Sequence, residues 1–240
     1  AVLWVFTGSR YFFSDDQGAT CRLPPDVPGT VTRPAVDIKG FDPAQYGAVN
    51  PPSLEGFLFP ATYQLDPGSD VNVLIPEQLE AFKQNFAKVD LAYAKKKNLT
   101  PYDVLIIASM VDREVAVAKE RPLVAAVIYN RLKQGMPLAI DATTRYEFNN
   151  YEDQITQSQL ESPSAYNTRT HMGLPPTPIG NPGLDAIQAA AHPAKVNYLF
   201  YVVKPGTCEH NFAANEAQFE QFNAQYQQAL QEQGGSPTSC

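Results

Sequence analysis

The segment of residues 100–118 constrains the fold of this chain most, because it combines helix start signals with an apolar stripe. Thr100 suits an N-cap, Pro101 suits the first helical position, and Asp103 completes a capping-box-like pattern that complements the helix dipole. At about 100° per residue, several apolar side chains share one face of this helix: Val104, Ile107, Val111, Val115 and Ala118. The segment is therefore predicted to be a helix that packs against a core.

One charged residue of this helix, Glu114, does not point away from the apolar face. Asp112 and Arg113 do so, whereas Glu114 falls between Ile107 and Met110, at the margin of the apolar arc. A carboxyl group in an apolar setting resists ionisation, so its pKa rises and it can serve as a general acid. The alternative is a carboxylate that reaches solvent at the rim of the stripe. The helical periodicity by itself leaves both interpretations open.

Composition narrows the classes of partner. The chain has 240 residues, 44% of them apolar and 18% charged, which fits one large domain or two small ones with a real core. A net charge of −7 without any basic block argues against nucleic acid as a partner and against binding to anionic lipid by charge alone. Residues 1–6 are apolar but too short to cross a bilayer, and they suit either the remnant of a membrane anchor or a first strand. The three cysteines form no CxxC pair, and their disulfide state stays open.

The remaining pattern predicts an α+β fold. Three further helices are expected before the C-terminal region, over residues 76–97, over 122–134 with Gly135 as its stop, and over 182–192 with Asn181 as N-cap. Residues 198–204 read as a strand and residues 210–213 as its hairpin partner. Asn215 and Gln218 open a last helix as a capping box.

Other parts of the chain have less regular patterns. Residues 1–52 are expected to be linker-like, with order beginning near Ser53, and residues 233–240 form a tail expected to fray. Residues 136–146 begin like a strand and then become polar. Residues 161–183 are rich in Pro, Gly, Asn, Ser and Thr without periodicity, which is typical of a functional loop.

Common catalytic motifs are absent from the sequence. It contains no HExxH, GxSxG, P-loop or GxGxxG motif, and its three histidines lack metal-ligand spacing, so no metal or other cofactor is expected. What remains is Glu114 together with a polar, aromatic-containing loop, a combination that suits carbohydrate. Cleaving a glycosidic bond needs a carboxylic acid that protonates the leaving oxygen, and ordinary glycosidases add a second carboxylate. Asp141 and Glu161 are candidates for that second group, whereas Asp112 points away from Glu114.

Four stretches of the sequence carry long motifs in a fixed order. The longest, ASMVDREVAVAKERPLVAAVIYNRLKQGMPLAIDATTRY, covers residues 108–146, and ESPSAYNTRTHMGLPPTPIGNPG covers residues 161–183. The other two are EGFLFPATY at residues 55–63 and GTCEHNF at residues 206–212, which has one residue more than a Gly-x-His-x-Phe hairpin motif. Together they resemble the signatures of the YceG-like family of endolytic murein transglycosylases (MltG). The resemblance spans about residues 53–230, and the order of these long motifs makes it specific.

The resemblance implies a YceG-like catalytic domain over residues 53–232, preceded by a truncated or degenerate LysM-like part. It also implies a lyase that cuts the MurNAc–GlcNAc β-1,4 bond of nascent glycan strands without water and leaves 1,6-anhydro-MurNAc ends. The implied catalytic residue is Glu114, the last residue of the motif VDRE; Asp112 stands where the family usually has Glu. The implied partners are peptidoglycan strands and peptidoglycan synthases at the outer face of the cytoplasmic membrane. In the family, contact with that membrane is made by an anchor, which is expected to be absent from this chain.

Residues outside the helix are expected to bind the sugar. Tyr166, Asn167 and Thr168 lie in the polar loop and are predicted sugar contacts. Asp141 and Thr143 follow the helix expected over 122–134, where a strand end could bring them close to Glu114; turn or capping roles are the alternative. Asn181 suits either a helix cap or a ligand contact, and the roles of Glu55 and His210 stay open. Two alternatives to a lyase remain at this point: a non-catalytic glycan-binding module and a two-carboxylate glycosidase.

Overall fold

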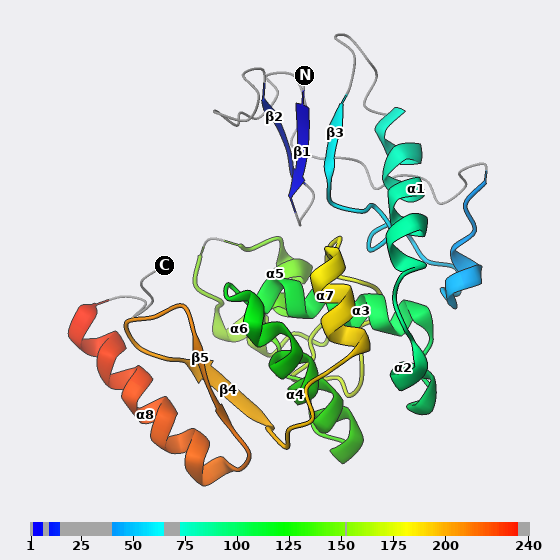
Figure 1. Cartoon of the computed structure of the whole chain (residues 1–240). Coiled ribbons are helices and arrows are strands. Elements are labelled where there is room, and N and C mark those ends of the chain that lie inside the picture. The colour runs from blue at the N-terminus through cyan, green and yellow to red at the C-terminus, as the bar shows by residue number, and fades with distance from the viewer. Residues whose placement is uncertain (1, 7–9, 15–39, 65–72, 152, 235–240) are drawn as a thin grey trace. The chain divides into compact units, whose positions relative to one another are not determined.

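The computed structural model describes residues 2–6, 10–14, 40–64, 73–151 and 153–234, which Figure 1 draws as ribbons. The chain divides into two compact units, each made of two segments. The first unit comprises Ala1–Asp112 and Pro176–Ala191, and the second comprises Arg113–Pro175 and His192–Cys240. Residues 15–39 of the expected linker-like region and most of the expected tail lie outside the described residues.

The described residues are mostly helical, with two small antiparallel sheets. One sheet has the strand order β2-β1-β3 and the other pairs β4 with β5. The helices are α1 (Leu74–Phe86), α2 (Ala92–Lys96), α3 (Pro101–Glu114), α4 (Arg121–Gln134), α5 (Asp141–Phe148), α6 (Gln157–Leu160), α7 (Leu184–Ala191) and α8 (Glu216–Gln233), with 3-10 turns η1 (Pro43–Tyr46) and η3 (Ala118–Glu120). The strands are β1 (Val2–Phe6), β2 (Arg10–Ser14), β3 (Thr62–Gln64), β4 (Phe200–Val203) and β5 (His210–Ala213). None of the described helices is long and apolar enough to cross a bilayer.

Order begins earlier in the chain than the composition indicated. β1 occupies most of the apolar stretch at residues 1–6, and it pairs with β2 on one side and β3 on the other. η1 then precedes Ser53, and Asp42 caps it by accepting a hydrogen bond from the Ala44 amide at 3.0 Å. The expectation that order begins near Ser53 was therefore wrong for these elements.

An aromatic cluster forms much of the core of the first unit. Phe57 and Phe82 are fully buried, with ring centroids 5.3 Å apart in an edge-to-face arrangement. Tyr102 of α3 stacks on Phe57 at 5.6 Å. Such aromatic pairs contribute more than the burial of their area. Other rings from the loop before β3 and from α1 complete the cluster: Phe41, Tyr46 and Phe86.

The helix expected over residues 76–97 is two helices. α1 ends at Phe86, and α2 begins at Ala92 after a break. The Asp90 carboxylate accepts a hydrogen bond from the Ala92 amide at 2.8 Å, which stabilises the start of α2. The predicted helix was correct as far as Phe86, and Leu79, Phe82 and Phe86 are buried as its core-facing residues. Beyond Phe86 the predicted continuous helix was wrong, because the local hydrogen bond between the Asp90 side chain and the Ala92 amide competes with helix continuation.

The helix predicted from Thr100 onward is confirmed at its start and shorter at its end. The Asp103 carboxylate accepts from the Thr100 amide at 2.7 Å, while the Thr100 hydroxyl accepts from the Asp103 amide at 3.1 Å. This reciprocal pair is the capping box that the sequence predicts. α3 ends at Glu114 instead of continuing to residue 118. Glu114 is therefore the last residue of its helix.

Asn181 holds two backbone segments of the first unit together and is not a helix cap. Its Oδ1 accepts hydrogen bonds from the Gly56 amide at 2.8 Å and from the Leu58 amide at 3.1 Å. α7 begins only at Leu184, so the prediction that Asn181 caps this helix was wrong. Gly56 has φ of +92°, and a Cβ there would lie 2.5 Å from Pro178, so glycine is required for this close approach.

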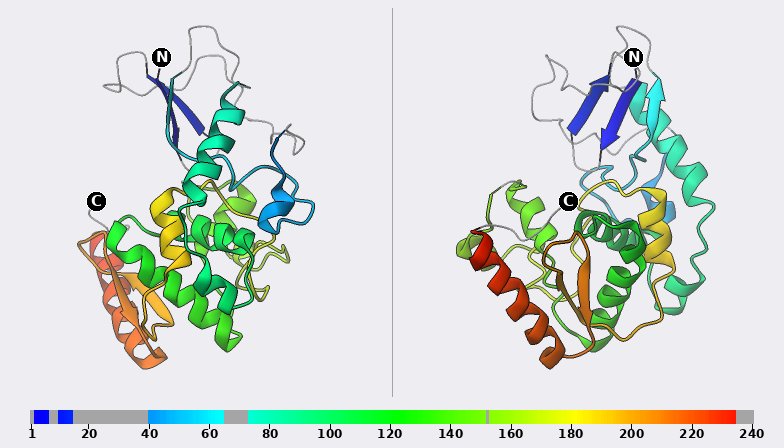
Figure 2. Two further views of the ribbon diagram at one scale, coloured as in Figure 1. Left: turned by 45° about the vertical axis from the view of Figure 1, so that its right-hand side comes forward. Right: turned by 60° about the vertical axis from the view of Figure 1, so that its left-hand side comes forward.

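The second unit is built around α4 and the β4–β5 hairpin. The Asn130 side-chain amide donates to the Val196 and Tyr198 carbonyls at 3.0 and 2.9 Å, and the Arg131 Nε donates to the Leu199 carbonyl at 2.6 Å. These bonds fix the chain that leads into β4. α8 packs against both strands of the hairpin, as Figure 2 shows, with Phe219 stacked on Phe200 at 5.1 Å.

Local sequence signals predicted several elements of the second unit. The stop of α4 at Gly135, which is in the left-handed conformation, is confirmed, as are the hairpin and the Asn215 cap of α8. Residues 136–146 were expected to begin like a strand, which was wrong, because residues 136–140 form no strand and α5 begins at Asp141. Cys208 is disulfide-bonded, whereas Cys21 and Cys240 lie outside the described residues.

Replacing Asn181 by Ala is expected to destabilise the protein by about 2–4 kcal/mol, because two backbone amides lose their acceptor in a buried place. Thermal unfolding followed by circular dichroism measures this change. Asn181→Asp keeps an acceptor oxygen and is expected to cost less, and Gln225→Ala on the exposed face of α8 is expected to change stability by less than about 0.5 kcal/mol. A similar melting temperature for Asn181→Ala and the wild-type protein would contradict this role.

Candidate active site around Glu114

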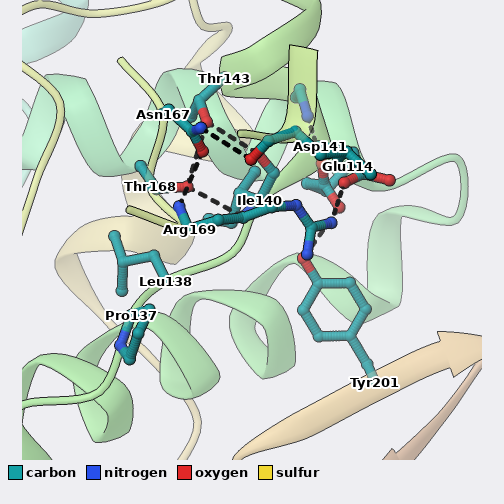
Figure 3. Close-up of polar contacts among 12 residues, drawn as sticks. Glu114, Pro137, Leu138, Ile140, Asp141, Thr143, Asn167, Thr168, Arg169 and Tyr201 are labelled. Atoms are coloured by element: carbon teal, nitrogen blue, oxygen red, sulfur yellow. Dashed lines mark hydrogen bonds and ion pairs between the residues drawn. The ribbon is translucent and has the colours of Figure 1, made fainter. Parts of the chain in front are cut away.

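The carboxyl group of Glu114 is held by two partners from elements that follow it in the chain. Its Oε1 accepts a hydrogen bond from the Ala142 amide at 3.2 Å, and its Oε2 accepts one from the Tyr201 hydroxyl at 2.8 Å (Figure 3). All three residues belong to the second unit. Glu114 therefore ends α3 with its carboxyl group bound between the start of α5 and strand β4.

The contact with Ala142 places the carboxyl group at a helix N-terminus. Ala142 is the second residue of α5, and Ile140, which precedes the helix, provides no side-chain cap. The first amides of a helix lack intrahelical acceptors and carry partial positive charge, which favours an anion close by. The residues next to α5 provide no side-chain acceptor for its first amides. Glu114, 28 residues earlier in the chain than Ala142, provides one.

Thr143 and Thr168 hold the start of α5 in place. The Thr168 hydroxyl accepts from the Ile140 amide at 3.0 Å, and its carbonyl accepts from the Ala139 amide at 2.9 Å. The two threonine hydroxyls lie 3.1 Å apart, and that of Thr143 also donates to the Ile140 carbonyl at 2.7 Å. Both side chains are buried. The structure therefore brings these two predicted site residues together, with their hydroxyls bonded within the protein.

The polar loop also uses most of its side-chain hydrogen bonds internally. Asn167 is buried; its amide nitrogen donates to the Leu160 and Ser162 carbonyls at 3.0 and 2.8 Å, and its Oδ1 accepts from the Arg169 amide at 3.0 Å. Tyr166 is part-buried and packs at a tilt against Tyr146, with centroids 5.2 Å apart. Contacts of these residues with sugar stay predictions, as does a contact of Asn181, which lies in the first unit.

An ion pair lies beside Glu114 at the start of α5. The Arg169 guanidinium donates to Asp141 Oδ1, and the two side chains are 36% and 52% exposed. A pair as exposed as this contributes little to stability. Its position matters more, because Asp141 is the first residue of α5 and its negative charge acts on Glu114.

Burial raises the pKa of Glu114 above the ordinary value of a carboxyl group. The hydrogen bonds from Tyr201 and Ala142 oppose this shift because they stabilise the ionised form. The charge of Asp141 adds to the increase, and that of His210 lowers the pKa. Burial thus favours the neutral carboxyl group more than in an exposed glutamate, while two hydrogen-bond donors to the carboxylate are already in position.

The pKa of Tyr201 is raised well above its ordinary value, first by burial and then by the negative charge of Glu114. Its phenol therefore stays protonated and able to donate. Behind it, the Glu120 carboxylate accepts from the His210 backbone amide at 2.9 Å, and its other oxygen lies 2.8 Å from His210 Nδ1. His210 packs edge-on against the Tyr201 ring at 5.3 Å.

The sequence pattern did not reveal Tyr201, Arg169 and Glu120. Tyr201 lies within the apolar run of a predicted strand, where an aromatic residue ordinarily packs in a core. Arg169 and Glu120 lie within the stretches that resemble the family, but no local pattern assigns them a role. Their contacts with the site come from pairings across 28 residues or more, for which the sequence contains no local signal.

Several known proteins are similar to this chain. A sequence profile of the YceG-like family matches residues 20–225. The endolytic murein transglycosylase of Bacillus subtilis is 32% identical to this chain, over 79% of this chain and 50% of the relative. The endolytic murein transglycosylase of Streptococcus pneumoniae is 33% identical, over 72% of this chain and 32% of the relative. The chain thus spans half or less of these relatives.

A solved structure is also similar. A YceG-like protein from Listeria monocytogenes superposes with a TM-score of 0.64 and 31% identity, over 72% of this chain and 56% of that one. The profile covers most of this chain and the structural match covers nearly three quarters of it. This chain therefore belongs to the YceG-like family.

Proposed function

We propose that this chain contains the catalytic part of an endolytic murein transglycosylase, in which Glu114 acts first as general acid and then as general base. The substrate would be the MurNAc–GlcNAc β-1,4 bond inside nascent peptidoglycan strands, and the products would carry 1,6-anhydro-MurNAc ends that stop elongation. The names of the relatives support the substrate class. The observation that carries the proposal is the paired Glu114 carboxyl group, with a raised pKa and two donors in place.

In the first step, the proton of Glu114 passes to the glycosidic oxygen as the bond from C1 of MurNAc to that oxygen breaks. The sugar acquires oxocarbenium-like charge, and the Glu114 carboxylate is stabilised by the Ala142 amide and the Tyr201 hydroxyl. In the second step, the C6 hydroxyl oxygen attacks C1 of the same sugar and its proton passes to Glu114. No water is consumed and Glu114 ends as it began, because the nucleophile is intramolecular.

Two other functions remain as outcomes of the tests. A non-catalytic glycan-binding module would bind strands without cutting them. A two-carboxylate hydrolase would need a second acid, and Asp141 is the candidate that acts electrostatically on Glu114. The ion pair between Asp141 and Arg169 favours a supporting role for this carboxylate over a nucleophilic one. The location proposed for the protein, the outer face of the cytoplasmic membrane beside peptidoglycan synthases, follows from the proposed substrate.

Glu114→Gln is expected to lower the cleavage rate by roughly 10²–10⁴-fold, because the amide cannot deliver a proton. Digestion of uncrosslinked glycan strands followed by mass spectrometry measures both the rate and the chemical nature of the new ends. Glu216→Gln, at an exposed position of α8, makes the same chemical change and is expected to leave the rate unaltered. Retained activity in Glu114→Gln would exclude Glu114 as the acid.

Asp141→Asn separates a lyase from a hydrolase. The lyase retains anhydro ends in this variant, since Asp141 takes no part in bond formation, and its rate changes only moderately through the lost charge beside Glu114. A hydrolase that uses Asp141 would lose turnover, and its wild-type products would carry reducing ends. Reducing-end MurNAc from the wild-type protein would overturn the lyase proposal.

Stability should depend on pH through Glu114. Its pKa is higher in the folded than in the unfolded protein, so the native state holds the proton more tightly. The contribution of the neutral group to the free energy of unfolding is fully present below the pKa of Glu114 in the unfolded protein. It is lost as the pH rises through the pKa of Glu114 in the folded protein. Glu114→Gln, which cannot ionise, is therefore expected to melt higher than wild type at about pH 8, with a difference that shrinks towards about pH 4. A constant or opposite difference across this range would contradict the raised pKa.

A further inference from the structure

We infer that Tyr201 is a positioning residue that pairs with Glu114 in both proton transfers, and that the buried Glu120–His210 pair holds the Tyr201 ring in place for this task. This inference rests on the proposed function. It extends that function to residues on the β4–β5 hairpin and η3, none of which the sequence motifs mark as catalytic.

A carboxyl group that acts as acid and then as base needs a partner suited to both of its states. The Ala142 amide can only donate, so Glu114 Oε1 serves as an acceptor throughout and the transferable proton belongs on Oε2. The Tyr201 hydroxyl lies 2.8 Å from Oε2. A hydroxyl can donate and accept. It can therefore accept a hydrogen bond from the neutral carboxyl group, and it can donate one to the same oxygen once the proton has gone to the substrate.

The hydroxyl also keeps the carboxyl group in one orientation between the two steps. Oε1 is bound to α5 and Oε2 to β4, so rotation of the carboxyl group would break both hydrogen bonds. A hydrogen bond to an ionised acceptor is roughly twice as strong as one between neutral groups. Tyr201 therefore stabilises the carboxylate more than the neutral acid, which aids the first transfer as charge develops on Glu114.

The Glu120–His210 pair fixes the far side of the Tyr201 ring. The two side chains are 5% and 10% exposed, and Glu120 uses both oxygens on His210: one on the backbone amide and one on Nδ1. His210 belongs to β5 and stands opposite Val203 of β4, two residues from Tyr201. Its ring meets the Tyr201 ring at 87°. Glu120 thereby ties β5 to the turn before α4, and this contact holds His210 against Tyr201.

Other charged groups act on the pair of Glu114 and Tyr201. Asp141 of α5 raises the pKa of both groups, whereas His210 of β5 lowers that of Glu114. Arg131 of α4 lowers the pKa of Tyr201. Arg169, from the polar loop, is ion-paired with Asp141. Removing the Tyr201 hydroxyl leaves these charges in place, so a change in the titration of Glu114 can be assigned to the lost hydrogen bond.

Tyr201→Phe keeps the ring and its packing but removes the hydroxyl. It is expected to lower kcat by roughly 10- to 100-fold with little change in KM, because a hydrogen bond to developing charge is lost. Since Glu114 must start protonated, the alkaline limb of kcat/KM reports its pKa and is expected to move to higher pH. Tyr198→Phe, a hydroxyl deletion just before β4, is the matched control and is expected to change neither kcat nor the alkaline limb of kcat/KM. An unaltered kcat and pH profile in Tyr201→Phe would overturn the inference.

A double-variant cycle tests the role of the Glu120–His210 pair. Glu120→Gln is expected to lower kcat several-fold in the wild-type background and to have little further effect in Tyr201→Phe, because the pair acts through Tyr201. Equal effects in both backgrounds would show that Glu120 does not act through Tyr201. Melting temperatures of the same four proteins distinguish a general loss of stability from this coupling.

Failure of this inference can be told apart from failure of the proposed function. The carboxyl ¹³C resonance of Glu114, identified by its absence in Glu114→Gln, reports the titration of this group without substrate. It is expected to titrate at higher pH in Tyr201→Phe whether or not the protein cleaves glycan. Wild-type protein without anhydro products would refute the proposed function, whereas an unshifted resonance would refute the role of Tyr201.

Discussion

The second unit of this structure depends on one carboxyl group, because Glu114 joins the end of α3 to the start of α5 and to strand β4. A helix that begins without its own cap needs an acceptor for its first amides. Glu114 provides one, and in doing so it is brought into a setting where burial disfavours its charge. The contact that orders the start of α5 is thus also one of the contacts that oppose the effect of burial on the carboxyl group.

Two opposing physical effects act on the pKa of this one side chain. Burial raises the pKa of Glu114, while the α5 amide and the Tyr201 hydroxyl stabilise its ionised form. The proposed function needs both effects, because burial favours the protonated form that an acid requires and the donors favour the carboxylate that remains after proton transfer. The threonine pair of Thr143 and Thr168 matters to this balance because it fixes the backbone from which the Ala142 amide points.

Local chemistry explains which elements could be predicted and which could not. The Thr100–Asp103 capping box, the Gly135 stop and the β4–β5 hairpin depend on residues close in sequence, and all three are present. The predictions failed where distant contacts override local pattern. Asn181 resembles a helix cap, yet its side chain binds the Gly56 and Leu58 amides, more than 120 residues away. Residues 141–146 resemble a polar strand end, yet an acceptor from α3 allows them to begin a helix.

The sequence by itself determined that Glu114 lies on an apolar helix and that a polar loop follows later in the chain, because helix periodicity and turn chemistry act over a few residues. It also contained the motifs by which the YceG-like family is identified. Only the tertiary structure decided which groups surround the carboxyl group. Tyr201 lies 87 residues from Glu114, and the amide of Ala142 lies 28 residues from it. Hydrogen bonds across such separations form only when the whole unit has folded, so no local pattern encodes them.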